Sequence, residues 1–413
     1  MYKTASVSVF TLFLLICFSF IPVNVRCDVF EFRHTPGAMY RILSVVDEAV
    51  FINGILSHRA EILNRIAVEI TDVVDGRGMH RAVFQTSERI IFDSALRVQP
   101  QQPTAFGWSR EYESVFERDR LGRLTIDPRY FMPVVRNVPV FPDRELNILD
   151  RWSAEGHEIH DFRDAFGIQE PYRIPFTANY VYVGMREWKE KEYPAFSVTY
   201  RIASRPSPVR GRLYPLRITG DFDQIVYWNH DIGQAVAYEE SFRISFEMSD
   251  GRRIEFRGTA HADFIEADGM DRERLLSEIT EEINRLEIPG VNVREVEEGI
   301  SLSLEDIRFH PDSARMLAGE EAKLERIARI LMRYPGRDIL VSGHAALAGT
   351  PEYLMELSQE RARAVADYLI SHNVRSADRI VIRGYGAQRP VADNSTEEGM
   401  RSNRRVEITI LEN

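Results

Sequence analysis

The sequence predicts a mixed fold in which two β-rich, sandwich-like domains precede a smaller α+β domain. From Asp28 to about Asp268, apolar and polar residues alternate with a period of two between Gly and Pro residues, which is typical of strands buried on one face. From about residue 291, short alternating segments are separated by segments in which apolar residues recur at helical spacing. A chain of 413 residues is long enough for two to three domains with cores of their own.

The first 27 residues have the pattern of a secretory signal peptide, with Lys3 before an apolar run from Val7 to Ile21. The run of about 15 residues is shorter than the ~20 that span hydrocarbon, so we expect cleavage near Cys27 and no structural disulfide. The alternative is a lipoprotein acylated at Cys27, although the preceding Arg26 matches that signal poorly. We therefore expect an exported, periplasmic protein, free or associated with the outer membrane, whose membrane contact is peripheral at most.

Two hairpins are predicted in the β-rich region, where Asp-Gly pairs separate alternating runs. One turn is Asp75-Gly76 and the other is Asp250-Gly251, which follows an apolar face from Phe242 to Met248. A further strand runs from Phe196 to Ile202.

Composition does not mark a sharp boundary inside this region, and we place one near residue 150. The first β-rich domain then spans 28–150. The second spans 151–290 and ends in an amphipathic helix, with an apolar stripe from Leu275 to Leu286 that Pro289-Gly290 terminates. We expect the helix to dock on its own domain, with a connector to the next domain as the alternative.

The third domain, 291–413, is expected to alternate strands with helices. Its predicted strands lie around 300–304, 339–341, 380–382 and 406–410, and its predicted helices around 324–334 and 351–371.

Six motifs in this third domain occur in a recognisable order and spacing. They are Phe309-His310-Pro311-Asp312-Ser313-Ala314, Gly343-His344, Leu357-Ser358-Gln359-Glu360-Arg361-Ala362, Gly384-Tyr385-Gly386, Ala392-Asp393-Asn394 and Asn403-Arg404-Arg405-Val406-Glu407-Ile408. The domain resembles the OmpA-like peptidoglycan-binding domain shared by outer-membrane protein A, peptidoglycan-associated lipoprotein and the flagellar stator protein MotB. The upstream sequence is similar in style to OmpA-domain proteins of spirochaetes, especially treponemes.

The resemblance implies a pocket that holds the zwitterionic end of a stem-peptide diamino acid. In the family an Asp takes the ammonium and an Arg takes the carboxylate, as a charge-assisted pair. Arg361 occupies the Arg position, but the Asp position is Ala346. The family's Thr is Ala345 and its Asn is Leu354, so three polar pocket positions are apolar here.

The remaining pocket residues admit two interpretations. Arg361 binds ligand or makes a salt bridge with a neighbour such as Glu360 or Asp393. By resemblance, Asn403 and Arg404, together with Arg405, line the pocket or buttress it, and we favour buttressing. Glu352 and Glu356 are near enough in sequence to replace the lost charge.

Several other functions are disfavoured by the sequence. The net charge of −11 argues against nucleic acid as a partner. His157-Glu158-Ile159-His160-Asp161 does not have the spacing of a helical zinc site, because its two His are three positions apart and would face opposite sides of a strand. No nucleophile elbow occurs, so we expect neither an enzyme nor a cofactor or metal.

The leading hypothesis is therefore a periplasmic structural protein whose divergent OmpA-like domain contacts peptidoglycan with altered or weakened diamino-acid recognition. Loss of one charge-assisted hydrogen bond lowers affinity by about 10- to 150-fold. The first alternative is an envelope scaffold that has lost peptidoglycan binding and contacts other envelope proteins. The second is an outer-membrane β-barrel with a periplasmic tail, which the short strands and charged outward faces disfavour.

Overall fold

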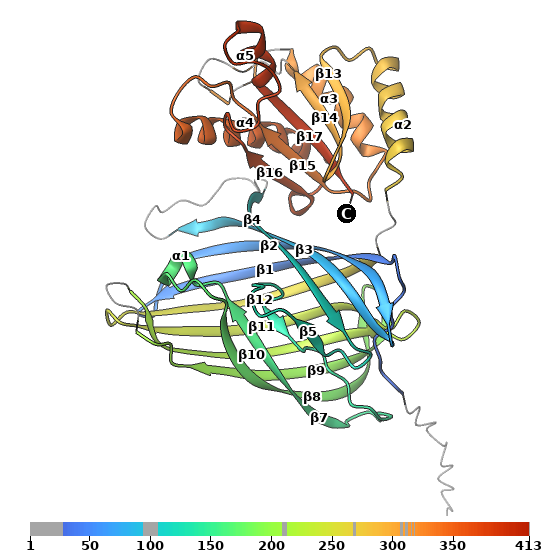
Figure 1. The fold of residues 1–413 in the computed structure, drawn as a ribbon, viewed down its shortest axis with the longest axis vertical. Helices are drawn as coiled ribbons and strands as arrows, with labels where there is room; N and C mark the ends of the chain where they lie inside the picture. The colour runs from blue at the N-terminus through green and yellow to red at the C-terminus, as the bar shows by residue number, and fades with distance from the viewer. Residues whose placement is uncertain are drawn as a thin grey trace, which may run out of the picture.

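A computed structural model describes residues 28–93, 106–208, 213–266, 270–305 and 319–412, together with 309, 313, 314, 316 and 317. The predicted signal peptide, residues 1–27, and residues 310–312 of the first motif lie outside the described residues. The chain forms a curled β-sheet with an α+β domain stacked against it (Figure 1).

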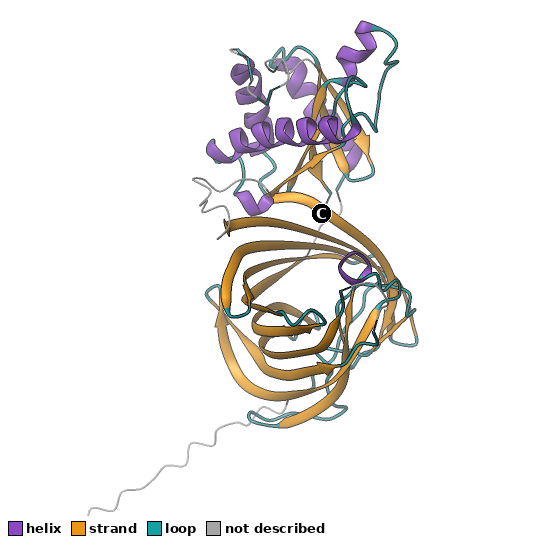
Figure 2. Ribbon diagram, turned by 90° about the vertical axis from the view of Figure 1, so that its left-hand side faces the viewer, coloured by secondary structure: helices purple, strands orange, loops and turns teal. Residues whose placement is uncertain are grey.

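The N-terminal part is one antiparallel sheet that curls back on itself (Figure 2), and we call it the curled sheet. Its hydrogen-bonded neighbours run β7-β8-β9-β10-β11-β12-β1-β2-β3-β4. Its strands are β1 (Met39–Ile52), β2 (Ile55–Val74), β3 (Arg77–Asp93), β4 (Phe106–Arg118), β7 (Arg151–His160), β8 (Tyr172–Trp188), β9 (Lys191–Ser204), β10 (Pro215–Asn229), β11 (Gln234–Met248) and β12 (Arg253–Glu266).

Strand β1 joins the two halves of the curled sheet. It pairs with β2 on one side and with β12 on the other, so that Ser44 lies opposite both Asn64 and Ala262. The structure thus differs from the expected pair of sandwich-like domains with a boundary near residue 150. Alternation shows which face of a strand is buried, but it does not specify which distant strand is its neighbour.

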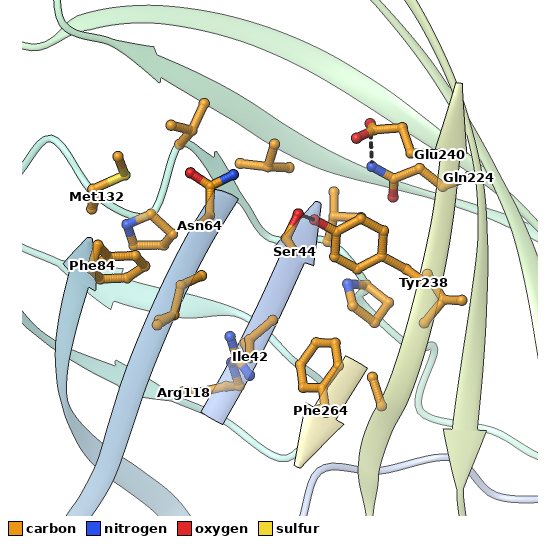
Figure 3. Close-up of a pocket in the computed structure, with 18 of the residues that line it drawn as sticks. Ile42, Ser44, Asn64, Phe84, Arg118, Met132, Gln224, Tyr238, Glu240 and Phe264 are labelled. Carbon is orange, nitrogen blue, oxygen red and sulfur yellow. Dashed lines mark hydrogen bonds between the residues drawn. The ribbon is translucent and has the colours of Figure 1, made fainter. Parts of the chain in front are cut away.

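The inner face of the curled sheet can be followed through the strand register. One row of opposed residues runs around it through Tyr182, Phe196, Val226, Tyr238, Ala262, Ser44, Asn64 and Thr86. Tyr182, Phe196, Val226 and Ala262 are buried. This row bounds an internal cavity (Figure 3).

The outer face carries cross-strand ion pairs. Arg201 pairs with Asp221 at 2.7 Å, and Arg243 pairs with Glu255 at 2.9 Å. Both predicted Asp-Gly turns are present, since Val74 pairs with Arg77 across Asp75-Gly76 and β11 pairs with β12 across the second turn. Asp75 and Gly76 both have positive φ angles, 50° and 74°, which a two-residue hairpin of this kind requires.

Residues 119–150 and the segment 28–38 fill the gap between β4 and β7. Residues 119–150 contain β5 (Leu124–Ile126), which pairs with β4, and β6 (Val135–Arg136), which pairs with β7. Phe30 packs on Phe141 and Phe196 at ring-centroid distances of 5.7 and 4.7 Å, and all three are buried. A short helix, α1 (Arg163–Phe166), follows β7.

The C-terminal domain places helices against a five-stranded run of the sheet ordered β13-β14-β17-β15-β16 among the described residues. Its elements are α2 (Arg272–Arg285), β13 (Val291–Val296), β14 (Gly299–Glu305), α3 (Glu320–Met332), β15 (Ile339–Gly343), α4 (Pro351–Ser371), the 3₁₀ turn η1 (Ala377–Arg379), β16 (Ile380–Gly384), α5 (Glu397–Asn403) and β17 (Arg405–Leu411). The element order confirms the predicted alternation of strands and helices.

Helix α2 belongs to this domain and not to the β-rich region. Leu275, Ile279 and Ile283 are buried in the same core as Ile300 and Leu324. The expected docking of this helix on its own β-rich domain is therefore wrong. An apolar stripe shows that a helix is buried on one side, but it does not show against which neighbour.

The curled sheet and the C-terminal domain share an apolar junction. Leu63 and Phe106 of the curled sheet cluster with Leu340, Val381 and Leu411 of the C-terminal domain. The start of β4 also pairs in parallel with β16, with Phe106 opposite Val381. The two parts are thus joined through both backbone and side chains.

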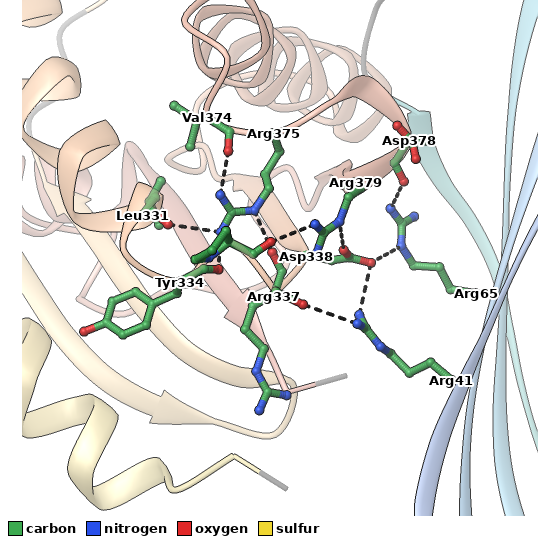
Figure 4. A network of polar contacts seen from close by, with 12 residues as sticks. Arg41, Arg65, Leu331, Tyr334, Arg337, Asp338, Val374, Arg375, Asp378 and Arg379 are labelled. Atoms are coloured by element: carbon green, nitrogen blue, oxygen red, sulfur yellow. Dashed lines mark hydrogen bonds and ion pairs between the residues drawn. The ribbon is translucent and has the colours of Figure 1, made fainter. Parts of the chain in front are cut away.

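At the same junction, the buried carboxylate of Asp338 forms ion pairs with arginines from both parts of the chain (Figure 4). Asp338 lies 3.1 Å from Arg65 and 3.5 Å from Arg41, both on the curled sheet, and 2.8 Å from Arg379 of its own domain. The Asp338 side chain is 5% exposed.

The described part of the chain contains no helix that is long and apolar enough to cross a membrane.

Candidate functional site

The family motifs of the C-terminal domain meet where β15 and β16 end beside α4. Ser358 of α4 accepts a hydrogen bond from the Gly386 backbone N–H at 2.9 Å and donates to the Met355 carbonyl at 2.8 Å. A Cβ atom added at Gly343 would lie 1.9 Å from the Ser358 carbonyl oxygen. The Gly-His, Leu-Ser and Gly-Tyr-Gly motifs therefore form one close-packed framework.

The three positions predicted to have lost their polar side chains lie in this framework. Ala345, Ala346 and Leu354 are 5%, 3% and 4% exposed. The Ala345 backbone N–H donates to the Gly386 carbonyl at 2.8 Å, and this bond helps to hold the chain after β15. The methyl group of Ala346 offers no acceptor for an ammonium group.

Arg361 lies on α4, seven residues after Leu354 and so on the same helical face. Its Nε donates to the Ser313 carbonyl at 3.3 Å, and its guanidinium lies 5.1 Å from the centre of the Phe309 ring. The side chain thus bridges α4 to the segment that carries the first motif. Glu352 and Glu356 are exposed on α4, whereas Leu354 is buried.

Asn403 holds the loop that precedes α5. Its Oδ1 accepts from the backbone N–H groups of Val391 and Ala392 at 2.7 and 3.0 Å, and its Nδ2 donates to the Ala392 carbonyl and to Asn394. Asn403 is fully buried, while Arg404 is exposed. These contacts are those of a buttress. The carboxylate of Asp393 accepts hydrogen bonds from the backbone and hydroxyl of Ser395, which lower its pKa.

A charged cluster that the sequence analysis did not single out lies across the sheet from the helices. Glu407 accepts from Arg405 at 2.7 Å and from Arg294 at 2.6 Å. Burial, with Arg405 next to it, lowers the pKa of His344 to about 3, so this ring is neutral at physiological pH. The cluster borders a cavity of about 400 Å³. The sequence contained one signal for this cluster: Arg405 and Glu407 occupy alternate positions of β17, between the apolar residues that face the helices.

The sequence motif with two histidines lies on β7 of the curled sheet. Nε2 of His160 lies 2.8 Å from Glu158, while Nδ1 of His157 lies 3.4 Å from Arg173. Among the described residues, no group of three or more His, Cys, Asp or Glu side chains could hold a metal ion. Burial and the neighbouring Arg173 lower the pKa of His157 to about 4.

Comparison with known proteins places a family domain at the C-terminal end of the chain. Residues 308–404 match the OmpA family. Outer membrane porin F of Pseudomonas aeruginosa is 37% identical over 105 residues, which are 25% of this chain and 30% of that protein. The peptidoglycan-associated lipoprotein of Rhizobium meliloti is 38% identical over 105 residues, 25% of this chain and 58% of that protein.

Among solved structures, an outer membrane protein from Borrelia burgdorferi is 39% identical, with a TM-score of 0.25. The match covers 29% of this chain and 96% of that one. The family match at residues 308–404 shows that the chain carries a C-terminal OmpA-family domain. The chain spans less than two thirds of the length of either curated relative named above.

Proposed function

We propose that this chain is an exported, non-enzymatic structural protein of the periplasm whose OmpA-family domain contacts peptidoglycan with weakened recognition of the diamino acid. The observation that carries the proposal is the buried methyl group of Ala346 beside a retained framework and a retained Arg361. The Rhizobium relative is named as peptidoglycan-associated, which supports the same partner for this domain.

In the proposed contact, only one of the two charged groups of the diamino acid meets an oppositely charged side chain. Arg361 can offer a planar pair of donors to a carboxylate. The ammonium of the same diamino acid would meet Ala346 instead of a carboxylate, which lowers affinity by about 10- to 150-fold. Asn403 is not required to touch the ligand, because its side-chain amide is hydrogen-bonded to the loop before α5.

Retention on purified peptidoglycan sacculi tests the proposal. We expect weak retention of the wild-type protein, less retention of Arg361→Ala, and more retention of Ala346→Asp on diaminopimelate-containing sacculi, by at least about tenfold. The matched controls are Arg363→Ala on the same helix and Ala348→Asp, which adds the same charge at an exposed position. Equal retention of wild type and Arg361→Ala would remove this pocket from wall binding.

A second candidate function is an assembly module for other envelope proteins. It is favoured by apolar side chains exposed beside the same site, since Leu347, Tyr353 and Val391 are 66%, 40% and 48% exposed. The Leu347 backbone donates to Asn394, and Asn394 accepts from Asn403, so the loops that carry Leu347 and Val391 are adjacent. No sacculus retention together with a reproducible cross-linked partner would support this function.

A further inference from the structure

The interior of the curled sheet contains a cavity of 290 Å³ (Figure 3). It is bounded by the inner faces of β1–β4 and β10–β12, and it is closed on another side by the segment from Met132 to Pro139. This cavity lies in a different part of the molecule from the OmpA-family site. It is therefore independent of any contact with peptidoglycan.

Most of the cavity wall is apolar. The lining includes Ile42, Ile66, Phe84, Val226 and Phe264. A cavity of ~150 Å³ with a similar wall is large enough for benzene. The volume of 290 Å³ is about twice that size, which suits an apolar body of about ten to twelve carbon atoms.

The polar side chains of the lining other than Arg118 are mostly paired with one another. Ser44 and Tyr238 share a hydrogen bond of 3.0 Å, Thr86 donates to Asn64 at 2.9 Å, and Gln224 donates to Glu240 at 2.7 Å. Figure 3 labels Ser44, Tyr238, Gln224 and Glu240 of these pairs. They can accommodate a polar group.

Arg118 is the arginine among the residues that line the cavity. Its guanidinium lies 4.8 Å from the centre of the Phe32 ring and 5.9 Å from that of Phe116. Its Nε is buried and has no hydrogen-bond partner within the described part of the chain. Buried polar groups of this kind are costly unless they are paired.

The groups around Arg118 do not supply a counter-charge. Burial and Arg118 itself lower the pKa values of His34 and His80, the latter to about 2, so both rings are neutral. Asp119 instead accepts hydrogen bonds from the backbones of Leu121 and Arg123. Glu240 lines the same cavity but is bonded to Gln224.

We propose that the curled sheet is a binding module for a small amphiphile with an anionic head, its apolar body in the cavity and its carboxylate on Arg118. A carboxylate provides the acceptor that the buried Nε lacks, and a charge-assisted hydrogen bond of this type is stronger than a neutral one. A medium-chain fatty acid has the required size and charge.

Isothermal titration of the full chain, purified after export, with decanoate, decan-1-ol and decylammonium tests the proposal. We expect decanoate to bind about 10- to 150-fold more tightly than decan-1-ol and decylammonium to bind most weakly. Arg118→Met should abolish the preference for decanoate while retaining decan-1-ol binding. Arg120→Met is the matched control, because Arg120 is an exposed arginine paired with Asp143, and it should behave like the wild type.

A cavity-filling variant keeps the test decisive if Arg118→Met does not fold. Ala235 lines the cavity and is 5% exposed, so Ala235→Leu should weaken decanoate and decan-1-ol together. Absence of decanoate binding to the wild type, or a decanoate preference that persists in Arg118→Met, would overturn the proposal.

Discussion

Buried polar residues in this protein serve different purposes according to their partners. The side-chain amide of Asn403 hydrogen-bonds to backbone groups of Val391 and Ala392 and so holds the loop before α5. Asp338 forms ion pairs with arginines from two parts of the chain. Arg118 and Glu240 face an internal cavity, and neither forms an ion pair within the described residues. The last two therefore differ from Asp338, whose charge is paired within the protein.

Glu240 makes the stability of the curled sheet depend on pH. Burial, together with the nearby Glu158, raises the pKa of Glu240 to about 7 from an ordinary value of 4.5. The native state then holds the proton more tightly than the unfolded chain, so the stabilising effect is complete below about pH 4.5 and is lost as the pH rises through 7.

Glu240→Gln keeps an oxygen acceptor for Gln224 and removes this titration. We expect its free energy of unfolding, relative to the wild type, to increase by about 2–3 kcal/mol between pH 5 and pH 8. Denaturant unfolding at several pH values measures it. Glu239→Gln, on the outer face, is the control, and a pH-independent difference between Glu240→Gln and wild type would contradict the assignment.

At the scale of elements, the site is shaped by close approach of backbones. Strand β15 ends against α4 at Gly343, and the turn after β16 is fastened to the same helix through Ser358. Arg375, which is 7% exposed, donates to the carbonyls of Leu331 and Arg337 and so caps the end of α3. These contacts hold the framework together around the buried side chains of Ala345, Ala346 and Leu354.

Gly343→Ala should separate β15 from α4. The added methyl group would meet the Ser358 carbonyl oxygen, a backbone atom that cannot move aside without shifting the helix. We expect a loss of stability of about 1–3 kcal/mol or more, seen as a lower denaturant midpoint. Gly336→Ala, where no atom lies within 4 Å of the added Cβ, should cost little, and equal effects of both changes would refute this account.

At the scale of the whole molecule, the junction sets how the two parts are oriented. The apolar cluster around Phe106 and Leu340 lies beside Asp338, whose carboxylate faces Arg41 and Arg65 of the curled sheet. Breaking a buried pair by removing one partner is costly because it leaves charge uncompensated. The C-terminal domain is therefore held against the curled sheet by both apolar and ionic contacts.

Asp338→Ala should loosen this junction by about 3–5 kcal/mol. Spin labels on cysteines introduced at Thr177 and Asn373, in a chain that begins at Asp28 and so has no other cysteine, report the distance between the two parts. We expect the distance distribution to broaden in Asp338→Ala. Asp378→Ala is the control because Arg65 contacts its backbone carbonyl, and an unchanged distribution in Asp338→Ala would show that the apolar cluster suffices.

The elements of the C-terminal domain were largely predictable because each depends on local periodicity and on motifs. The predicted helix at 351–371 has the bounds of α4, and both Asp-Gly hairpins form. The assignment of α2 and the division of the β-rich region were not predictable. Both depend on which distant surfaces meet, as in the contact of Ile279 with the core around Ile300.

The sequence by itself determined the alternating faces of the strands, the turns between them, and the family motifs of the C-terminal domain, because these follow from local patterns and motif spacing. Only the tertiary structure decided that β1 pairs with β12, that Asp338 joins the two parts, and that Arg118 faces a cavity. Those features require residues far apart in the chain to meet, and periodicity carries no information about such pairings.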